Sequence, residues 1–320
     1  MPTSNRSLLD LEWLVIMENV HCPVMVKEVI SALKIASEGV YVDCTVGEGG
    51  HSLAISGATD PKPTIVGIDL DKNALTTAKK MLGERAVLIN DSYVKIKEIS
   101  HRLNYRKIDG ILLDLGLSSL QLETTNKGFS FARESRLDMR FDTKQELSAW
   151  EIVNKYSQQE LADILYFYSN ESKSRQLAKA IVNARPIDTT TELANLIKST
   201  MFSNRKSKIH PATRTFQALR IATNDELGNI QKVLSNALDI LKTGGRVVVI
   251  TYHSIEDRLV KRFMTKYASK CICPPNNPIC DCEHEPKIKL ISKKVIKPSE
   301  NEVNKNPRSR SAKLRVAELL

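Results

Sequence analysis

Val40-Tyr-Val-Asp-Cys-Thr-Val-Gly-Glu-Gly-Gly-His-Ser-Leu53 is the stretch that decides the fold of this 320-residue chain. Its first three residues are β-branched or aromatic and predict a short strand that ends at Asp43. A glycine-rich turn follows at once, and Ser52 to Ile55 predict the start of a helix. This order is typical of a nucleotide site, because glycine lets the backbone approach a ligand and a helix start offers free N–H groups. The alternative is that Asp43 merely caps a tight turn.

A second acidic residue ends the next predicted strand, Thr64-Ile-Val-Gly-Ile-Asp69. Its position after a strand, 26 residues beyond Asp43, suits an acceptor for ribose hydroxyls. The glycine turn also contains Glu48, whose negative charge would repel a pyrophosphate but tolerates a cationic ligand. The pattern therefore favours S-adenosyl-L-methionine, which carries a sulfonium and an ammonium group, over a nicotinamide dinucleotide.

Strands and helices alternate along the first part of the chain. Further strands are predicted at Ala86–Ile89, Ile111–Asp114 and Arg246–Tyr252, with helical patterns between them. Such alternation predicts an α/β fold with a parallel, doubly wound sheet, in which ligands bind at the carboxyl ends of the strands. The acidic residues expected at that edge are Asp43, Asp69, Asp91 and Asp114.

The alternation of predicted strands and helices stops after Ser119. Capping boxes beginning at Ser148, Ser157 and Thr189 predict a series of helices, so residues 120–210 are interpreted as a helical insertion for substrate recognition. The remaining chain is then a tail, residues 1–20, and a core formed by residues 21–119 and 211–320. In the second half of this core, one long helix is expected to end at Gly244-Gly245 and the next is expected to be capped by Ser254.

The chain has an excess of positive charge. The net charge is +10, and residues 261–320 hold 14 basic against six acidic residues. This imbalance favours a polyanionic partner such as nucleic acid, the alternative being a solvated basic surface. No apolar run is long enough to cross a bilayer, and the first residues lack the basic region of a signal peptide. We therefore expect a cytoplasmic protein without a membrane partner.

Seven blocks of sequence together resemble the MraW, or ribosomal small subunit methyltransferase H, family. They are Asp43–Ser52, Ile111–Gln121, Gly128–Phe131, Leu137–Arg140, His210–Gln217, His253–Arg258 and Asn306–Ser311. The resemblance implies a class I methyltransferase (Rossmann-like) sheet with an inserted all-helical domain. It also implies S-adenosyl-L-methionine-dependent methylation of the N4 amine of a cytosine in 16S rRNA, within the small ribosomal subunit. A homodimer is left open.

The same resemblance implies the cofactor-binding residues: Gly49, Gly50, His51, Asp69, Tyr93, Asp114 and Gln121. Tyr93 is expected to stack on adenine, its alternative being an ordinary core aromatic residue. The chain departs from the family pattern at Val46 and Glu48, at Tyr93, where Phe is common, and at Leu120, where Pro is usual. The last of these affects the pose expected for Gln121.

The catalytic candidates follow from the chemistry of the acceptor. The N4 amine of cytosine is a poor nucleophile, so it needs alignment with the methyl group and an acceptor for one of its protons. We hypothesise that Asp114 lies between the donor and the target base, that Ser118, Ser119 or Asp138 assists, and that His253 lies near the base. Asp114 ranks first, and the residue that accepts the proton is left open.

Three alternatives to this function remain at this stage. A DNA cytosine-N4 methyltransferase is disfavoured, because no Pro-Pro-aromatic turn follows the fourth strand. An RNA-binding assembly factor with a vestigial donor pocket is disfavoured by the intact Gly49, Gly50, Asp69 and Asp114. A nicotinamide oxidoreductase is disfavoured by Glu48.

Basic and aromatic residues supply candidate RNA contacts. Phe129 and Phe131 could stack on a base, the alternative being that they pin a loop onto the core. The predicted phosphate contacts are Arg136, Arg140, Arg214, Arg220, Arg308 and Arg310.

Six cysteines divide into two groups. Cys22 and Cys44 are isolated and are interpreted as reduced packing residues. Cys271, Cys273, Cys280 and Cys282 are clustered, with His284 beside them, and form a candidate structural zinc site. The alternative is a metal-free loop, since Cys-x-Cys pairs are less typical of zinc sites than Cys-x-x-Cys pairs. No catalytic metal is indicated.

Overall fold

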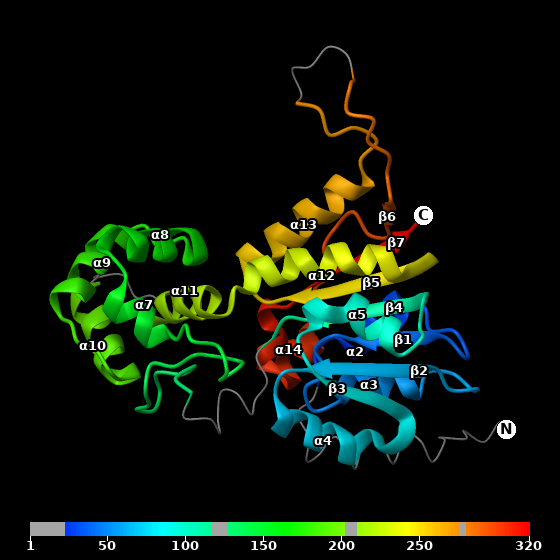
Figure 1. Cartoon of the computed structure of the whole chain (residues 1–320), viewed down its shortest axis with the longest axis horizontal. Helices are drawn as coiled ribbons and strands as arrows, with labels where there is room; N and C mark the ends of the chain where they lie inside the picture. Colours follow the sequence, from blue (N-terminus) through cyan, green and yellow to red (C-terminus); the bar gives the residue numbers. More distant parts are fainter. Residues whose placement is uncertain (1–22, 117–126, 202–209, 275–279) are drawn as a thin grey trace.

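A computed structural model of the whole chain describes residues 23–116, 127–201, 210–274 and 280–320 (Figure 1). Predictions for Ser118, Ser119, Leu120 and Gln121 lie outside these residues. In the part described, no helix is long and apolar enough to cross a membrane.

A single seven-stranded sheet forms the centre of the molecule, with the strand order β3-β2-β1-β4-β5-β7-β6. The first five strands pair in parallel, as predicted, whereas β7 runs antiparallel to both of its neighbours. The predicted α/β fold class is therefore confirmed. The strands are β1 (Val40–Asp43), β2 (Thr64–Asp69), β3 (Ala86–Asn90), β4 (Ile108–Asp114), β5 (Leu241–Thr251), β6 (Ile288–Leu290) and β7 (Lys313–Leu319).

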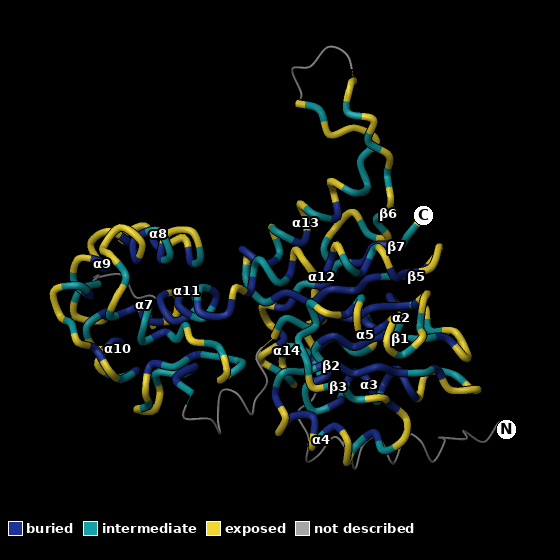
Figure 2. Tube along the Cα trace, viewed as in Figure 1, coloured by how far each residue is buried: buried dark blue, intermediate teal, exposed yellow. Residues whose placement is uncertain are grey.

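Helices cover both faces of this sheet, so most residues of the central strands are buried (Figure 2). The buried strand residues are mainly apolar on both faces. In β4, Ile111 and Leu113 join one core cluster, whereas Leu112 between them joins the other. The first cluster is covered by α5 (Ile96–Arg102), α12 (Glu226–Ile240) and α13 (Ser254–Ala268). The second is covered by α2 (Val26–Leu33), α3 (Gly50–Ser56) and α4 (Lys72–Leu82).

A separate helical lobe stands beside the sheet (Figure 1). It contains α7 (Ala149–Lys155), α8 (Gln158–Ser169), α9 (Ser174–Asn183), α10 (Thr190–Thr200) and α11 (Ala212–Asn224). The capping boxes expected at Ser157 and Thr189 are both formed.

The packing of α11 bears on the boundary of the insertion. The sequence interpretation returned the chain to the core at residue 211, but Phe216 and Leu219 of α11 are buried in the lobe's own apolar cluster. Because α11 packs against α8, we propose that the lobe extends to the turn at Asp225, where α12 begins.

Two predicted helix ends are wrong. Helix α12 ends at Ile240, and Gly244-Gly245 lie within β5, because the backbone after Ile240 already pairs with β4. Helix α13 is capped by His253 and not by Ser254: the Nδ1 atom of His253 accepts the N–H of Glu256, whose carboxylate accepts the N–H of His253. An imidazole in the capping role is outside the usual set of N-cap side chains.

A glycine in β2 gives a test of the packing beneath the glycine turn. A Cβ atom added at Gly67 would lie 2.8 Å from Val46 Cγ2 and from Leu88 Cδ2. We expect Gly67→Ala to lower the free energy of unfolding by about 1–3 kcal/mol, measured by chemical denaturation, because a β-branched valine cannot move aside within the core.

Gly57→Ala is the matched control for this substitution. Its added Cβ would have no neighbour closer than 3.7 Å, and the residue is exposed. We expect a change within about 0.5 kcal/mol. Equal effects of the two substitutions would refute the packing argument.

Candidate active site

The carboxyl ends of β1, β2, β4 and β5 meet around a cavity of about 410 Å³. The helical lobe contributes Phe141 and Arg220 to its wall, so the cavity lies between the sheet and the lobe. A second depression, of about 720 Å³, lies at the amino ends of β2 and β3. Its charged residues, such as Lys62 and Glu84, are exposed. The polar side chains that the sequence singled out gather in the first cavity.

The glycine turn after β1 forms one wall of the cavity. Gly47 and Gly49 have positive φ angles of 51° and 96°, which glycine adopts without strain. Gly47, Glu48 and Gly50 line the cavity. Gly49, predicted to bind the cofactor, does not: a Cβ there would lie 3.2 Å from Leu82 Cδ1, so this glycine permits α4 to pack closely against the turn.

Asp69, at the end of β2, joins the glycine turn to the neighbouring strand. Its two carboxylate oxygens accept the backbone N–H groups of Gly47 and Asp71, each at 2.9 Å. Burial raises the pKa of Asp69 to about 6, although both backbone N–H groups favour the carboxylate. The carboxylate lines the cavity and keeps lone pairs for further donors, as a ribose-binding residue requires.

Asp43 has a structural position beneath the turn. Its carboxylate accepts the hydroxyl of Ser52 at 2.8 Å and the N–H of Thr45 at 3.2 Å, and it does not line the cavity. Burial raises its pKa. The geometry supports the interpretation of Asp43 as a residue that caps the turn.

Asp114 and His51 face each other inside the cavity. The Oδ2 atom of Asp114 lies 3.4 Å from Nε2 of His51, although the contact lacks hydrogen-bond alignment. The backbone N–H of Asp114 donates to Thr45 Oγ1 at 2.7 Å, and its Oδ1 atom accepts the backbone N–H of Gly116 at 3.2 Å. Burial and the negative charge of Asp114 raise the pKa of the Tyr252 hydroxyl. The backbone of Asp114 is therefore held by the turn after β1, and its carboxylate is held by the backbone that follows β4.

His51 is buried and yet has unpaired ring nitrogens. Only 6% of its surface is exposed, and among the described residues neither Nδ1 nor Nε2 has a hydrogen-bond partner. Burying a polar group without a partner is costly. Two orphaned nitrogens at the edge of a cavity fit a polar ligand that completes their hydrogen bonding.

The position of Tyr93 is compatible with both of the roles considered from the sequence. Its ring packs against the first core cluster and also lines the cavity. Burial raises the pKa of its hydroxyl. The ring is thus held rigidly with part of its surface available to a planar ligand.

An ion-pair network at the border with the lobe was not found from the sequence. Arg220 donates to both oxygens of Glu226, at 2.7 and 2.8 Å, and lies 3.8 Å from Glu256. Glu256 also lies 2.8 Å from the Nε2 atom of His253. All four side chains line the cavity. The phosphate contact predicted at Arg220 stays a prediction, but its guanidinium is already paired with the carboxylates of Glu226 and Glu256 and is only 14% exposed.

Some predicted residues are placed away from the cavity. Asp138 does not line it, and both of its carboxylate oxygens accept from the Arg140 side chain, at 2.7 and 2.8 Å. This pairing lowers the pKa of Asp138 against the opposing effect of burial. Phe129 stacks on Phe141, with ring centroids 5.2 Å apart. Phe131 stacks on His210, so the two phenylalanines pin their loop onto the lobe.

The remaining arginines proposed for RNA binding lie at the surface. Arg136, Arg214, Arg308 and Arg310 are exposed, and Arg308 also lines the cavity. The four clustered cysteines lie elsewhere, between α13 and β6, and take no part in this site.

The cavity is rich in negative charge. Among the described residues, its lining contains five carboxylates, those of Glu48, Asp69, Asp114, Glu226 and Glu256, against the two guanidinium groups of Arg220 and Arg308. Arg220 is already paired with two of the carboxylates. Such a lining favours a cationic ligand and disfavours a pyrophosphate.

Comparisons with known proteins identify the family of the chain. A relative from Dehalococcoides mccartyi named "Ribosomal RNA small subunit methyltransferase H" is 49% identical over 301 residues, covering 93% of this chain and 86% of its own length. A relative of the same name from Clostridioides difficile is 46% identical, and the match covers 94% of this chain and 99% of the relative. Another, from Halothermothrix orenii, is 44% identical, and the match covers 93% of this chain and 98% of the relative. The sequence model of the MraW methylase family matches residues 18–320, and the chain therefore belongs to this family.

Proposed function

We propose that the protein transfers the methyl group of S-adenosyl-L-methionine to the N4 amine of a cytosine in 16S rRNA, within the small ribosomal subunit. The observation that carries the proposal is the anionic cavity with the buried imidazole of His51, which lies beside Asp114 and has no hydrogen-bond partner among the described residues, in a chain of a methylase family. The names of the relatives indicate small-subunit ribosomal RNA, and the resemblance of the sequence blocks indicates cytosine N4.

The residues of the cavity suit this methyl donor. S-adenosyl-L-methionine supplies an activated methyl group on a positive sulfur, and it carries an ammonium group but no phosphate. Glu48 and Asp114 favour the positive charges, and Asp69 would accept the ribose hydroxyls. Tyr93 would stack on adenine. His51 would gain the hydrogen-bond partner that it lacks among the described residues.

Asp114 is the strongest candidate for the proton acceptor. The side chain of Thr45 accepts its backbone N–H and the N–H of Gly116 donates to its Oδ1 atom, which holds it at the end of β4 with its carboxylate in the cavity. A fixed carboxylate can accept a hydrogen bond from the exocyclic amine, which localises the nitrogen lone pair and aligns it with the methyl group. His253 lies on the side of the cavity formed by α13, where it is held by Glu256, and would contact the target base.

The RNA would approach along the lobe and the C-terminal segment. Arg136, Arg214, Arg308 and Arg310 are exposed there and would contact phosphates. Assembled small subunits as the substrate, a cytoplasmic location and a homodimer stay predictions. Incubating the protein and labelled donor with small subunits, naked 16S rRNA and DNA, and then mapping the labelled base, tests the substrate directly. Label in DNA alone would refute the proposal.

The titration of Asp69 gives a pH test of donor binding. Its pKa of about 6 means that the carboxylate is ionised at pH 7.5 and becomes protonated as the pH falls. Protonation removes an acceptor for the ribose, so calorimetry should show S-adenosylhomocysteine binding about tenfold more weakly at pH 5 than at pH 7.5. Asp69→Asn should bind weakly at both values.

Asp91→Asn is the control, since Asp91 also follows a strand but does not line the cavity. It should keep the affinity and the pH profile of the unmodified protein. A pH-independent affinity in the unmodified protein would show that Asp69 does not contact the donor.

Asp114→Asn separates proton acceptance from donor binding. The amide keeps the size of the side chain but accepts protons poorly, so kcat should fall by about 10²- to 10⁴-fold. The dissociation constant of S-adenosylhomocysteine should change little, because this product lacks the sulfonium charge that Asp114 would favour. Asp138→Asn, outside the cavity, should keep kcat. Full activity of Asp114→Asn with normal donor binding would contradict the proposed role.

The exposed arginines of the C-terminal segment can be tested through salt dependence. Replacing Arg308 and Arg310 by glutamine should weaken RNA binding and reduce the slope of log K against log salt by about 1.4, or about 0.7 for each single-strand phosphate contact. Lys62→Gln with Lys80→Gln, at the opposite edge of the sheet, is the control with the same change of charge. Equal slopes for the two double variants would place the RNA elsewhere.

A further inference from the structure

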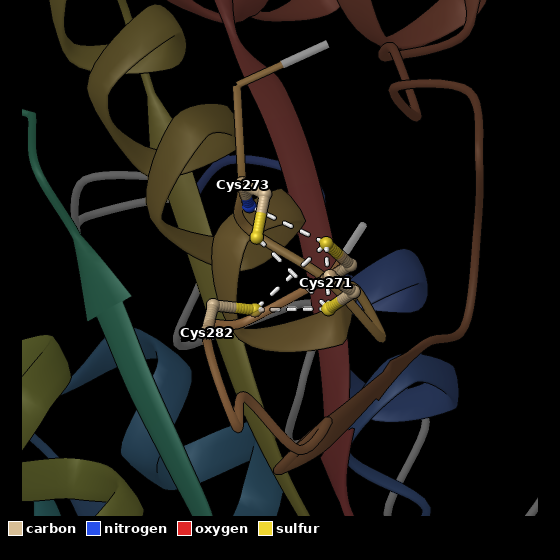
Figure 3. A group of neighbouring side chains, drawn as sticks. Cys271, Cys273 and Cys282 are labelled. Carbon is tan, nitrogen blue, oxygen red and sulfur yellow. Dashed lines mark hydrogen bonds between the residues drawn. The ribbon is translucent and has the colours of Figure 1, made fainter. Parts of the chain in front are cut away.

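Four cysteine side chains converge in the segment that joins α13 to β6 (Figure 3). The Sγ atoms of Cys271, Cys273, Cys280 and Cys282 all lie within 4.8 Å of one another. Cys280 Sγ is 3.4 Å from Cys271, 3.6 Å from Cys282 and 3.9 Å from Cys273. These separations exceed the roughly 2.05 Å of a disulfide. They match the spacing of about 3.8 Å expected for four sulfurs placed tetrahedrally about 2.3 Å from one zinc ion.

Apolar packing does not account for this convergence. Of the described residues between 269 and 287, none is buried, and none belongs to a core cluster. Ordering exposed backbone costs about 1–2 kcal/mol per residue, and a polar segment has little burial to offset that cost. The base of the segment is tied to α13 by the N–H of Lys287, which donates to Tyr267 O at 2.8 Å. Beyond this hydrogen bond, the four cysteines bring the outgoing and returning parts of the segment together among its described residues.

The surroundings of the sulfurs suit metal-bound thiolates. The backbone N–H of Ile272 donates to Cys282 Sγ at 3.5 Å, and that of Cys273 donates to Cys271 Sγ at 3.4 Å. Donors of this kind stabilise negative sulfur and orient it. His284 does not join the cluster, because its Nε2 atom is 2.9 Å from the carbonyl oxygen of Lys266. The ligand set is therefore four sulfurs.

We propose that Cys271, Cys273, Cys280 and Cys282 bind one structural Zn²⁺ ion. Four thiols would lose four protons and form four Zn–S bonds, giving a site with a net charge of −2 and no change of oxidation state. Tetrahedral sulfur coordination leaves no open position for a substrate, so the ion is structural. The 15 residues of α13 separate it from His253 by about 22 Å, at the other end of that helix.

Metal analysis of the full-length protein, purified without chelator, tests the proposal. We expect about one zinc per chain, and replacement by Co²⁺ should give the intense visible bands of tetrahedral thiolate coordination. Adding Zn²⁺ to the metal-free protein should release protons. Chelation should accelerate tryptic cleavage after Lys270 and Lys287 while leaving S-adenosylhomocysteine binding unchanged, because the cavity lies at the far end of α13.

Two substitutions and two controls sharpen this test. Cys273→Ser and Cys282→Ser should each lose the metal, whereas Cys22→Ser, a cysteine far away in the sequence, and His284→Ala should retain it. Should a cysteine variant fail to fold, the cobalt spectrum and the chelation experiment on the unmodified protein decide the matter.

Four outcomes would overturn the inference. They are bound iron in place of zinc, two disulfides found by mass spectrometry under non-reducing conditions, four free thiols that take up neither Zn²⁺ nor Co²⁺, and retention of zinc by both cysteine variants.

Discussion

Two hydrogen bonds between side chains and backbone join the strand ends on which the active site depends. Asp69 at the end of β2 accepts the N–H of Gly47 in the turn after β1, and Thr45 in the same turn accepts the N–H of Asp114 at the end of β4. Three neighbouring strands are thereby held in one register at their carboxyl edge. The glycine turn can only take this path because Gly47 and Gly49 adopt positive φ angles. The residues proposed to hold the donor lie around these connected strand ends.

The second constraint is the buried ion-pair network that connects the lobe to the sheet. Arg220 belongs to α11 in the lobe, Glu226 begins α12, and Glu256 lies in the first turn of α13. Removing one partner of a buried pair typically costs about 3–5 kcal/mol, because the other charge is left uncompensated. The network therefore couples the position of the proposed substrate lobe to the wall of the donor cavity. It also holds His253 through Glu256.

Helix α13 joins two regions with different chemistry. Its first turn carries Glu256 and follows His253 at the cavity, and its last turn leads into the four-cysteine segment. Rigid helical structure between them explains how an exposed segment without an apolar core can be attached to the enzyme without disturbing the active site (Figure 1). Catalysis and metal binding would then be separable, each with its own residues.

The sequence by itself determined the strand, glycine turn and helix around Asp43, the position of Asp69 at the end of the next strand, the capping boxes at Ser157 and Thr189, and the cysteine cluster. Each of these depends on residues a few positions apart, whose hydrogen bonds and spacing are visible as local patterns. Only the tertiary structure placed His51 against Asp114, turned Gly49 towards α4 and paired Arg220 with Glu256. These contacts depend on how helices pack over the sheet and on which charges that packing buries. No pattern within one segment encodes them, because the partner residues belong to elements far apart in the chain.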